Sequence, residues 1–429
     1  MSDTPEAPRK TLTRTQGYAT RRAAATLLEA VWEKRRPLEE ALSALGTHIP
    51  PRDKAAAHRI AAAVLRHAGS LDSVLEPFLR REPPAPVRAA LRMGAAELLL
   101  LGTPAHAVVS ATVAIVPKAF AGLTNAVLRK VATEGPALFE GLDRERLDTP
   151  PWLWSTWHAA YGPKVRAIAR AHAEEAPLDL TLAPGVALPE GATLLPTGGA
   201  RLPAGTRVTE LPGFAEGHFW VQDAAASLPA KLLGARPGER IADLCAAPGG
   251  KTAQLVAAGA KVTAVERDPK RAARLRENLA RLHLEAEVIE ADAALWSPGV
   301  TFDAVLLDAP CTATGIIRRH PDIPHLKRNA DVAQMAAAQA RLLERAAALL
   351  APGGRLVLAT CSLQPEEGEA HLARAAALGL VLDPIRPEEL PRLEMAITAA
   401  GTLRTRPDYW PKLGGLDGFF AARFTRPAG

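Results

Sequence analysis

The chain has 429 residues, a length that predicts two or three domains rather than one. Apolar residues make up 48% and charged residues 23% of the sequence, which excludes wholesale disorder and a membrane protein. No apolar run reaches 18 residues and no apolar segment lies near the N-terminus, so we expect a cytoplasmic protein without a membrane partner. The three cysteines form no CxxC pair and have no His cluster nearby, so we expect reduced thiols and no metal.

The net charge of +6 is concentrated at the N-terminal end of the chain. Residues 1–130 hold 19 Lys and Arg against 11 Asp and Glu, an excess of eight positive charges. Such an excess suits either an ordinary solvated surface or a polyanionic partner such as nucleic acid. Charge alone leaves both interpretations open.

From residue 18 to about residue 133 the apolar residues follow a helical period. Leu71, Leu75 and Phe78, for example, lie three or four residues apart, and the pair Pro83–Pro84 separates two helical stretches. This region is predicted to be an all-α bundle. Residues 184–217 contain twelve Pro or Gly between short apolar pieces, which predicts brief strands at 193–195 and 207–209 in a small mixed subdomain.

After residue 240 the pattern changes to apolar strands that alternate with helices, which is typical of a doubly wound α/β sheet. The segment from Gly418 to Phe424 is predicted to be a late antiparallel edge strand. The other predicted elements are a helix over 269–282 and strands over 241–244, 262–265, 286–289, 304–307 and 356–359.

A loop of small residues follows the first of these strands, Asp243-Leu-Cys-Ala-Ala-Pro-Gly-Gly-Lys-Thr252. Backbone N–H groups at the start of a helix suit a ligand here. The loop is neither an ATP-binding P-loop, which needs Gly at position 245, nor a GxGxxG dinucleotide fingerprint. Glu266 and Asp292 end the next two strands; either one alone suits a helix cap, but together they suit the ribose and base of an adenosine. The combination predicts S-adenosylmethionine.

Two cysteines follow adjacent central strands, in the stretches Asp308-Ala-Pro-Cys311 and Ala359-Thr-Cys361. A single buried Cys indicates only packing, but two at one sheet edge indicate chemistry. C5 of cytosine or uracil is a weak nucleophile, so an enzyme that methylates it first adds a thiolate at C6. Methyltransferases that act on amino groups need no thiol and typically have Asn/Asp-Pro-Pro-Tyr in place of this Asp-Ala-Pro-Cys.

With these motifs the sequence resembles the RsmB/Sun family of bacterial ribosomal RNA cytosine-5 methyltransferases, over nearly the whole chain from Tyr18. Glu266 stands where Asp is common and Ala291 where Gly is common, and neither change removes a hydrogen-bond acceptor. Further family-like stretches are Leu123–Arg129, Val221–Asp223, Ile317–Asp322 and Asp417–Phe420.

The resemblance implies a multidomain architecture. It consists of a disordered tail over 1–17, an all-α NusB-like RNA-binding domain over 18–140, linker helices with a small α+β subdomain over 141–235, and an α/β Rossmann-like class I methyltransferase domain over 236–429. The implied cofactor is S-adenosyl-L-methionine. The implied partner is RNA, namely 16S (small-subunit) ribosomal RNA, either free or within an assembling subunit; the oligomeric state stays open.

The resemblance also assigns roles to residues. Cys361 is the implied nucleophile and Cys311 the thiol that assists product release. Asp308 either contacts the N3/N4 edge of cytosine or holds the cofactor, and the role of Lys251 stays open. The implied cofactor pocket consists of Cys245, Ala246, Ala247, Pro248, Gly249, Gly250, Lys251, Glu266, Asp292 and Asp308.

Two expectations concern the neighbouring loops. Ser362 and residues 364–367 are expected to begin a helix directly after Cys361. The partial positive charge at the start of that helix would favour a Cys361 thiolate. Arg318, Arg319 and His320 are expected to contact RNA phosphates beside a flipped base, with a solvated loop as the alternative.

Two other functions fit parts of the sequence. A DNA cytosine-5 methyltransferase uses the Pro-Cys thiol as its nucleophile, but the Thr-Cys-Ser motif and the NusB-like front argue against it. The second is an RNA-binding scaffold with a degenerate methyltransferase site; both thiols, Asp308 and the small-residue loop argue against that.

Overall fold

The computed structural model describes residues 14–428. The chain divides into two compact units. Unit 1 extends to Pro150 and also includes His320–Leu326, whereas unit 2 comprises Pro151–Arg319 and the chain from Lys327 onward. Within residues 14–428, no helix is both long enough and apolar enough to span a membrane.

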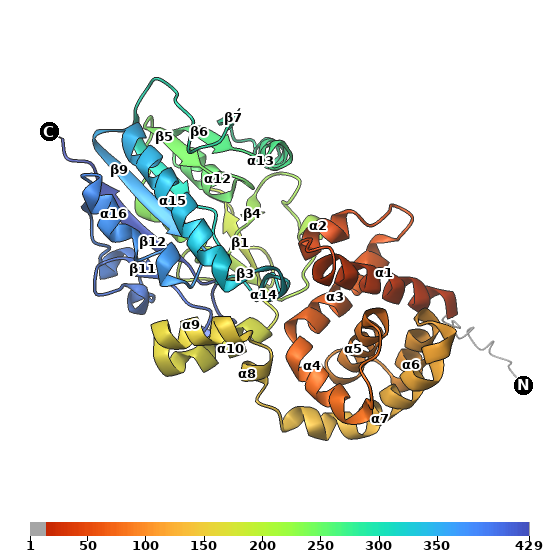
Figure 1. The fold of residues 1–429 in the computed structure, drawn as a ribbon. Coiled ribbons are helices and arrows are strands. Elements are labelled where there is room, and N and C mark those ends of the chain that lie inside the picture. The colour runs from red at the N-terminus through yellow and green to blue at the C-terminus, as the bar shows by residue number, and fades with distance from the viewer. Residues whose placement is uncertain (1–13, 429) are drawn as a thin grey trace, which may run out of the picture. The chain divides into compact units, whose positions relative to one another are not determined.

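Unit 1 is a helical bundle, as the apolar period predicts (Figure 1). Its core is formed by aliphatic side chains such as Leu27, Leu71 and Leu128, which are fully buried. Its first eight helices are α1 (Arg14–Trp32), α2 (Leu38–Ser43), α3 (Pro51–Arg66), α4 (Ala68–Leu75), α5 (Ala85–Leu99), α6 (Ala105–Ile115), α7 (Ala121–Glu140) and α8 (Arg144–Leu147), with 3-10 turns η1 (Glu76–Phe78) and η2 (Lys118–Phe120).

Two predicted boundaries of this region need correction. Helix α1 begins at Arg14, so residues 14–17 are helical and not part of a disordered tail. The rest of the predicted tail, residues 1–13, lies outside the described part of the chain. Residues 141–150 were expected to join the following subdomain, but they belong to unit 1, where Asp148 accepts hydrogen bonds from the Ser70 backbone N–H and hydroxyl.

A short segment from the C-terminal half of the sequence also belongs to unit 1. It contains α14 (Ile323–Leu326), and the Asp322 carboxylate accepts a hydrogen bond from the Leu38 backbone N–H at 2.9 Å. His325 Nδ1 accepts from the Trp32 indole at 3.3 Å and Nε2 donates to the Leu65 carbonyl at 2.8 Å, a pattern that requires the neutral ring. Burial lowers the pKa of His325, which favours that form. Residues 320–326, which the sequence assigns to the methyltransferase domain over 236–429, therefore pack with unit 1.

Unit 2 begins with a helical pair and a small antiparallel sheet. Leu180, Ala200 and Phe219 form the core of this sheet. The predicted strand at 207–209 is wrong, because that segment forms the 3-10 turn η4 (Val208–Glu210). The elements are α9 (Pro151–Tyr161), η3 (Gly162–Lys164), α10 (Val165–Ala173), β1 (Leu178–Leu182), β2 (Thr193–Leu194), β3 (Ala200–Leu202) and β4 (Phe219–Val221), in the strand order β2-β3-β1-β4.

The remainder of unit 2 is the predicted α/β sheet, and all five predicted strands are present. The first part runs α11 (Leu228–Leu233), β5 (Arg240–Leu244), α12 (Gly250–Ala257), β6 (Lys261–Glu266), α13 (Pro269–Arg281), β7 (Glu287–Glu290), β8 (Phe302–Asp308), α15 (Asn329–Leu349) and β9 (Leu350–Thr360). The second part runs η5 (Pro365–Glu367), α16 (His371–Ala377), β10 (Val381–Leu382), η6 (Pro387–Glu389), η7 (Glu394–Ala396), β11 (Leu403–Arg404), η8 (Pro411–Leu413) and β12 (Phe420–Thr425).

The strands are ordered β10-β12-β9-β8-β5-β6-β7, with β5 to β9 parallel. Strand β12 is antiparallel to β9, as predicted, but it is not an edge strand, because β10 and β11 pair with its other side. The chain leaves β5 toward β6 and β7 and then returns to β8 on the opposite side. The carboxyl ends of β5 and β8 therefore flank the switch point, where open α/β sheets bind ligands.

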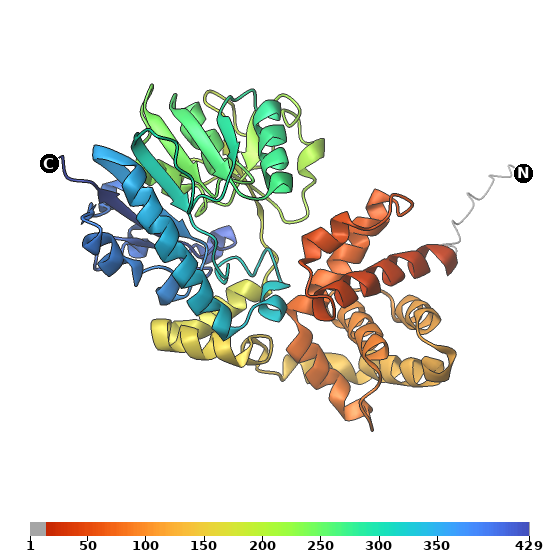
Figure 2. The same ribbon diagram turned by 45° about the horizontal axis from the view of Figure 1, so that its top comes forward.

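Helices cover both faces of this sheet. On β8, Leu306 packs with the α11 side of the sheet, whereas Val305 and Leu307 pack against Leu342 and Leu343 of α15. Figures 1 and 2 show α15 lying along one face. Burial on both faces explains why the strands appear in the sequence as continuous apolar runs.

Candidate active site

The small-residue loop after β5 makes a compact turn into α12. Cys245 and Gly249 have positive φ angles of 63° and 102°. A Cβ atom at Gly249 would lie 2.3 Å from Leu275 Cδ1, so only glycine fits where α13 packs against the loop. The loop thus presents backbone groups, rather than side chains, at the carboxyl end of β5.

Glu266 ends β6 and faces this loop. Its side chain is buried and accepts hydrogen bonds from the Asp268 backbone N–H at 3.0 Å and the Ala247 backbone N–H at 3.4 Å. Asp292, after β7, caps the following turn through the Ala294 N–H at 3.0 Å. Asp292 also lines a surface cavity of about 500 Å³ together with Arg267, Leu295, Pro310 and Leu342. The two acids thus sit at neighbouring strand ends of one sheet edge, as the sequence predicts.

Asp308 and Lys251 meet across the switch point. The Lys251 Nζ lies 2.6 Å from Asp308 Oδ2, and the ammonium lies 5.3 Å from the centre of the Phe419 ring. Burial lowers the pKa of Lys251, but the Asp308 carboxylate outweighs it and a Cys361 thiolate adds to the effect, so the pKa is raised. Lys251 is therefore a permanent cation beside the thiols.

The two thiols that follow β8 and β9 lie together. The sulfur atoms of Cys311 and Cys361 are 3.4 Å apart, a hydrogen-bond distance for sulfur and well beyond a disulfide bond of about 2.05 Å. The hydrogen bond with Cys361, burial and the charge of Glu367 hold the pKa of Cys311 well above its usual value. The Cys311 thiol is therefore protonated at neutral pH.

The third cysteine of the site region, Cys245, is partly buried, and the first acid of the loop, Asp243, is fully buried. Burial, followed by the charges of Asp308, Glu266 and Asp243, raises the pKa of Cys245 to about 12, so this thiol cannot act as a nucleophile near neutral pH. Asp243 accepts a hydrogen bond from the Thr252 hydroxyl at 2.6 Å, and burial raises its pKa to about 7. The structure thus singles out the other two thiols.

The predicted helix directly after Cys361 is wrong. The chain forms only the 3-10 turn η5, and α16 begins ten residues after the cysteine, at His371. The reason is that Ser362 and Glu367 use their side chains to bond each other and the Cys311 loop, which competes with a helical backbone. A helix dipole therefore does not activate Cys361.

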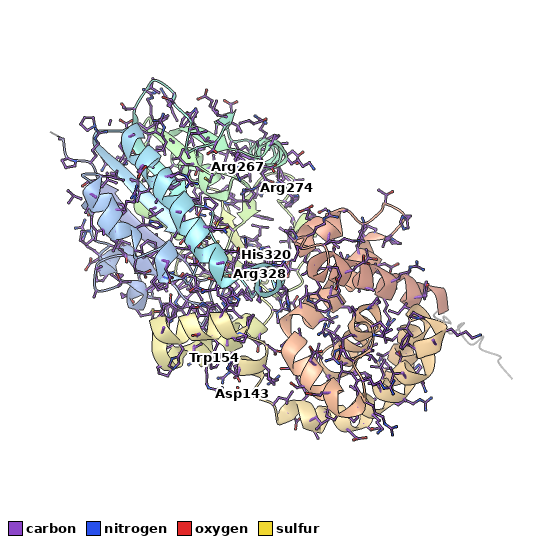
Figure 3. All side chains as sticks on the ribbon, viewed as in Figure 1. Asp143, Trp154, Arg267, Arg274, His320 and Arg328 are labelled. Atoms are coloured by element: carbon purple, nitrogen blue, oxygen red, sulfur yellow. The ribbon has the colours of Figure 1, made fainter. Side chains whose placement is uncertain are left out.

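Arg318, which is expected to contact an RNA phosphate, lies buried in the structure. Its guanidinium is buried and bonds Asp223 at 2.9 Å and Asp417 at 2.7 Å. Arg319 binds the same two carboxylates at 2.7 and 2.9 Å. Residues from three of the family-like stretches thus form one ion-pair network, in which the carboxylates of Asp223 and Asp417 bind both arginines. His320, labelled in Figure 3, is partly exposed and belongs to unit 1.

Glu367, Thr312 and Gln339 are site residues that the sequence analysis did not identify. Glu367 was considered only as a residue that favours a helix start, but its buried carboxylate bonds residues next to both thiols. The available signal was its placement six residues after Cys361 in a polar stretch, which gives no indication of burial. In the described residues, no group of three or more His, Cys, Asp or Glu is arranged to hold a metal ion.

Comparisons with known proteins show the family of this chain. The model of the 16S rRNA methyltransferase RsmB/F family matches residues 230–425, and the NusB family model matches residues 18–133. Ribosomal RNA small subunit methyltransferase B of Vibrio cholerae is 38% identical over 86% of this chain and 92% of its own length. The chain belongs to the RsmB/Sun methyltransferase family.

Solved structures share the fold. A crystal structure of the protein PH0851 matches 97% of this chain and 100% of its own length, with a TM-score of 0.72 at 22% identity. A methyltransferase homolog from Pyrococcus horikoshii matches 63% of this chain and 93% of its own, with a TM-score of 0.54 at 26% identity. The predicted architecture of a helical NusB domain joined to a Rossmann-like methyltransferase domain is confirmed.

Proposed function

We propose that this protein methylates C5 of a cytosine in small-subunit ribosomal RNA through a covalent bond between Cys361 and C6 of the base. The observation that carries the proposal is the pair of free thiols 3.4 Å apart beside the Lys251–Asp308 ion pair, at the carboxyl ends of β8 and β9. Transfer to an amino group needs no thiol, whereas activation of C5 needs one nucleophile and a second group that handles a proton. A two-thiol centre supplies both.

The proposed reaction begins at C6 of the base and ends with release of the base from Cys361. The Cys361 thiolate adds to C6, and the electron pair of the C5–C6 double bond would form the bond from C5 to the methyl group. The bond between that methyl group and the cofactor sulfur would break, with its electron pair staying on the cofactor sulfur. The electron pair of the C5–H bond then returns to the ring, and the bond between sulfur and C6 breaks. Cys311 lies next to the departing sulfur, so its thiol can donate a proton to that sulfur while the Cys311 thiolate that results takes the C5 proton.

Lys251 and Asp308 suit the electrostatics of this step. The Lys251 ammonium interacts electrostatically with Cys361, so it can stabilise negative charge on this sulfur as the bond to C6 forms and breaks. Asp308 uses Oδ2 for the lysine, and its side chain is 31% exposed. Its other oxygen can therefore accept a hydrogen bond from the amino group of cytosine.

The residues present fit S-adenosylmethionine, which supplies an electrophilic methyl group. Support comes from the compact loop over 245–249 and from Glu266 and Asp292 at neighbouring strand ends. Asp292→Ala should weaken binding of S-adenosylhomocysteine by about 1.5–3 kcal/mol, the value of one charge-assisted hydrogen bond. Isothermal calorimetry measures this, and unchanged affinity would place the cofactor elsewhere.

Ribosomal RNA is proposed as the substrate because the family match and the relatives' names refer to small-subunit ribosomal RNA. The positive charge of residues 1–130 supports an RNA partner for unit 1. Bisulfite sequencing of RNA from a strain without the gene tests the substrate. One cytosine of the small-subunit RNA should lose its mark, and an unchanged pattern there would exclude this substrate.

A trapping experiment tests the mechanism. Cys361→Ala should abolish methylation and leave no covalent RNA complex, because no bond to C6 forms. Cys311→Ala should allow attack and methyl transfer but stall release, so a protein–RNA adduct that resists SDS should accumulate. Labelled RNA on a denaturing gel detects it.

The control is the double variant Cys311→Ala/Cys361→Ala, which should form no adduct. The reverse pattern, with an adduct for Cys361→Ala and none for Cys311→Ala, would make Cys311 the nucleophile and favour the arrangement of DNA methyltransferases. Absence of any adduct together with normal methylation by both variants would exclude covalent catalysis.

A further inference from the structure

The carboxylate of Glu367 lies fully buried beneath the two thiol loops. Its Oε1 accepts the Thr312 backbone N–H at 2.8 Å, and its Oε2 accepts the Ser362 hydroxyl at 2.5 Å and the Thr312 hydroxyl. Thr312 directly follows Cys311, and Ser362 directly follows Cys361. One carboxylate therefore bonds the residues adjacent to both thiols.

A second layer of hydrogen bonds holds this carboxylate in place. Gln339 of α15 donates through Nε2 to Glu367 at 3.2 Å and to the Pro310 carbonyl at 2.9 Å. The amide oxygen of Gln339 accepts a hydrogen bond from His371 at 2.8 Å. Burial lowers the pKa of His371, so the ring is a neutral donor. The network leaves Glu367 little freedom to move.

Within the described residues Glu367 forms no ion pair with Lys or Arg. The nearby guanidinium of Arg404 pairs with Glu369 at 2.6 Å and donates to the Ser362 carbonyl. The donors to its carboxylate are uncharged groups of Thr312, Ser362 and Gln339. The charge of Arg404 acts on Glu367 without a direct ion pair, so the position of the carboxylate is set by the two thiol loops and Gln339.

We propose that Glu367 is the positioning residue of the two-thiol centre: through Thr312 and Ser362 it fixes the separation of the two sulfurs, and it places a negative charge beside the Cys311 loop. The reaction served rests on the proposed function. The separation of the sulfurs, however, is a property of the free protein and is tested without RNA.

The charges around the thiols agree with this role. Glu367 contributes to the raised pKa of Cys311, after the hydrogen bond with Cys361, burial and the charge of Cys361. On the other side Lys251, paired with Asp308, faces Cys361. The negative group thus adjoins the Cys311 loop, and the positive group faces Cys361.

Three substitutions separate geometry from charge. Glu367→Gln keeps the length of the side chain and removes its charge. The hydrogen bonds can be kept, because the amide oxygen can accept from the Thr312 N–H and the hydroxyls of Thr312 and Ser362 can rotate to accept from the NH₂ group. Glu367→Asp keeps the charge but shortens the reach, and Glu367→Ala removes both. The matched control is Glu366→Gln, the same change at the adjacent, exposed residue.

Phenylarsine oxide measures the geometry, because its arsenic binds two neighbouring thiols at once and releases one water. The unsubstituted protein, Glu366→Gln and Glu367→Gln should bind it tightly, and Cys311→Ala should not. Glu367→Asp and Glu367→Ala should bind it at least about tenfold more weakly, because the loops lose their common partner. Equal affinity in all folded variants would overturn the positioning role.

The pH dependence of alkylation measures the charge. Iodoacetamide labelling, followed at each cysteine by mass spectrometry, should show the midpoint of Cys311 about one pH unit lower in Glu367→Gln. Glu366→Gln should leave the midpoint unchanged. An unchanged midpoint in Glu367→Gln would show that the carboxylate is only a structural acceptor.

Methylation kinetics connect the result to the reaction. Glu367→Ala should lower kcat by about 100-fold, the usual effect of a displacement of about 1 Å, with KM for RNA unchanged. An unchanged kcat would overturn the proposal. If the unsubstituted protein methylates no RNA, the proposed function fails, while the arsenical and alkylation results still decide the role of Glu367.

Discussion

Lys251 and Asp308 are unequally buried, and this determines what each contributes. The lysine side chain is 11% exposed and the aspartate 31%. Because burial alone lowers the pKa of Lys251, the cation depends on its carboxylate. At pH 7, Asp308→Leu should lower the free energy of unfolding by about 2–3 kcal/mol, below the range for fully buried pairs because Asp308 is partly solvated.

The double variant Lys251→Met/Asp308→Leu distinguishes stability from catalysis. It replaces the ion pair with apolar side chains and should recover most of the lost stability, because no uncompensated charge remains. Neither Asp308→Leu nor the double variant should methylate RNA. Urea unfolding and a methylation assay measure the two quantities, and an active double variant would remove the pair from the mechanism.

Asp243 gives the protein a pH-dependent stability. Burial raises its pKa from 3.8 to about 7, so the folded state holds the proton more tightly than the unfolded state. The resulting stability is complete below pH 4 and is lost as the pH rises through 7. Asp243→Asn cannot ionise, so its stability relative to the unsubstituted protein should increase by up to about 4 kcal/mol between pH 4 and 8.

Asp268 is the control of opposite sign. It caps α13 by accepting the Lys270 and Arg271 backbone N–H groups, which lower its pKa. Its contribution is present above the unfolded pKa and lost as the pH falls, so Asp268→Asn should cost most at neutral pH. Urea midpoints measured across this pH range test both variants. A flat difference for Asp243→Asn would show that the carboxyl is already charged in the folded state.

At the scale of elements, the sequence predicts what depends on local pattern. The five parallel strands and α13 follow from apolar runs and amphipathic spacing, and the thiols, Lys251 and Asp308 follow from motifs at strand ends. The edge position of β12 was wrong because β10 and β11 are strands of two residues, too short to produce a pattern.

The errors at the site have a common physical reason. Arg318 and Glu367 are charged side chains in polar stretches, and a sequence does not show that such side chains are buried. Both are buried because partners far along the chain satisfy them: Asp223 and Asp417 for the arginine, and Thr312 for the glutamate. These pairings arise only when the loops meet in the folded protein.

The ion-pair network joins loops from several elements, and this predicts a large loss of stability on substitution. Arg318→Met leaves the buried Asp223 and Asp417 carboxylates with Arg319 alone, at a cost of about 3–5 kcal/mol. The arginines hold the pKa of Asp223 below its usual range despite burial, so the carboxylate stays charged. The urea midpoint of Arg318→Met should fall accordingly.

The exposed Arg274 on α13, labelled in Figure 3, provides the matched control. Arg274→Met should change stability by less than about 0.5 kcal/mol. For Arg318→Met, the salt dependence of RNA binding should stay the same, because a buried guanidinium neutralises no phosphate. A reduced salt slope with normal stability would restore the phosphate contact that the buried geometry excludes.

For the molecule as a whole, the role of unit 1 is better tested by removing charges than by removing the unit. Deletion of residues 1–150 would remove the hydrogen-bond partners of Asp322 and His325. These partners are the Leu38 N–H, the Trp32 indole and the Leu65 carbonyl. The resulting defect would mix lost RNA contacts with a disturbed segment that directly follows the loop of Cys311. Substitution of exposed cations leaves this segment intact.

Neutralising exposed cations of unit 1 should weaken RNA binding and flatten its dependence on salt. Each lost phosphate contact lowers the log–log slope by about 0.7–0.9. Filter binding from 50 to 300 mM salt gives the slope, and affinity for S-adenosylhomocysteine should stay unchanged because the loop over 245–251 lies in unit 2. The substituted residues, all exposed, are Arg52, Arg81, Lys118 and Arg129, each changed to Gln.

The control neutralises Arg236 and Lys261, exposed residues at the amino ends of β5 and β6. The proposed site lies at the carboxyl ends of these parallel strands, so the two cations are at the opposite edge of the sheet and should not contact the substrate. Their loss should leave both affinity and slope unchanged. If instead the unit 1 variant keeps its slope, the positive charge of residues 1–130 is an ordinary solvated surface, and RNA is held by unit 2.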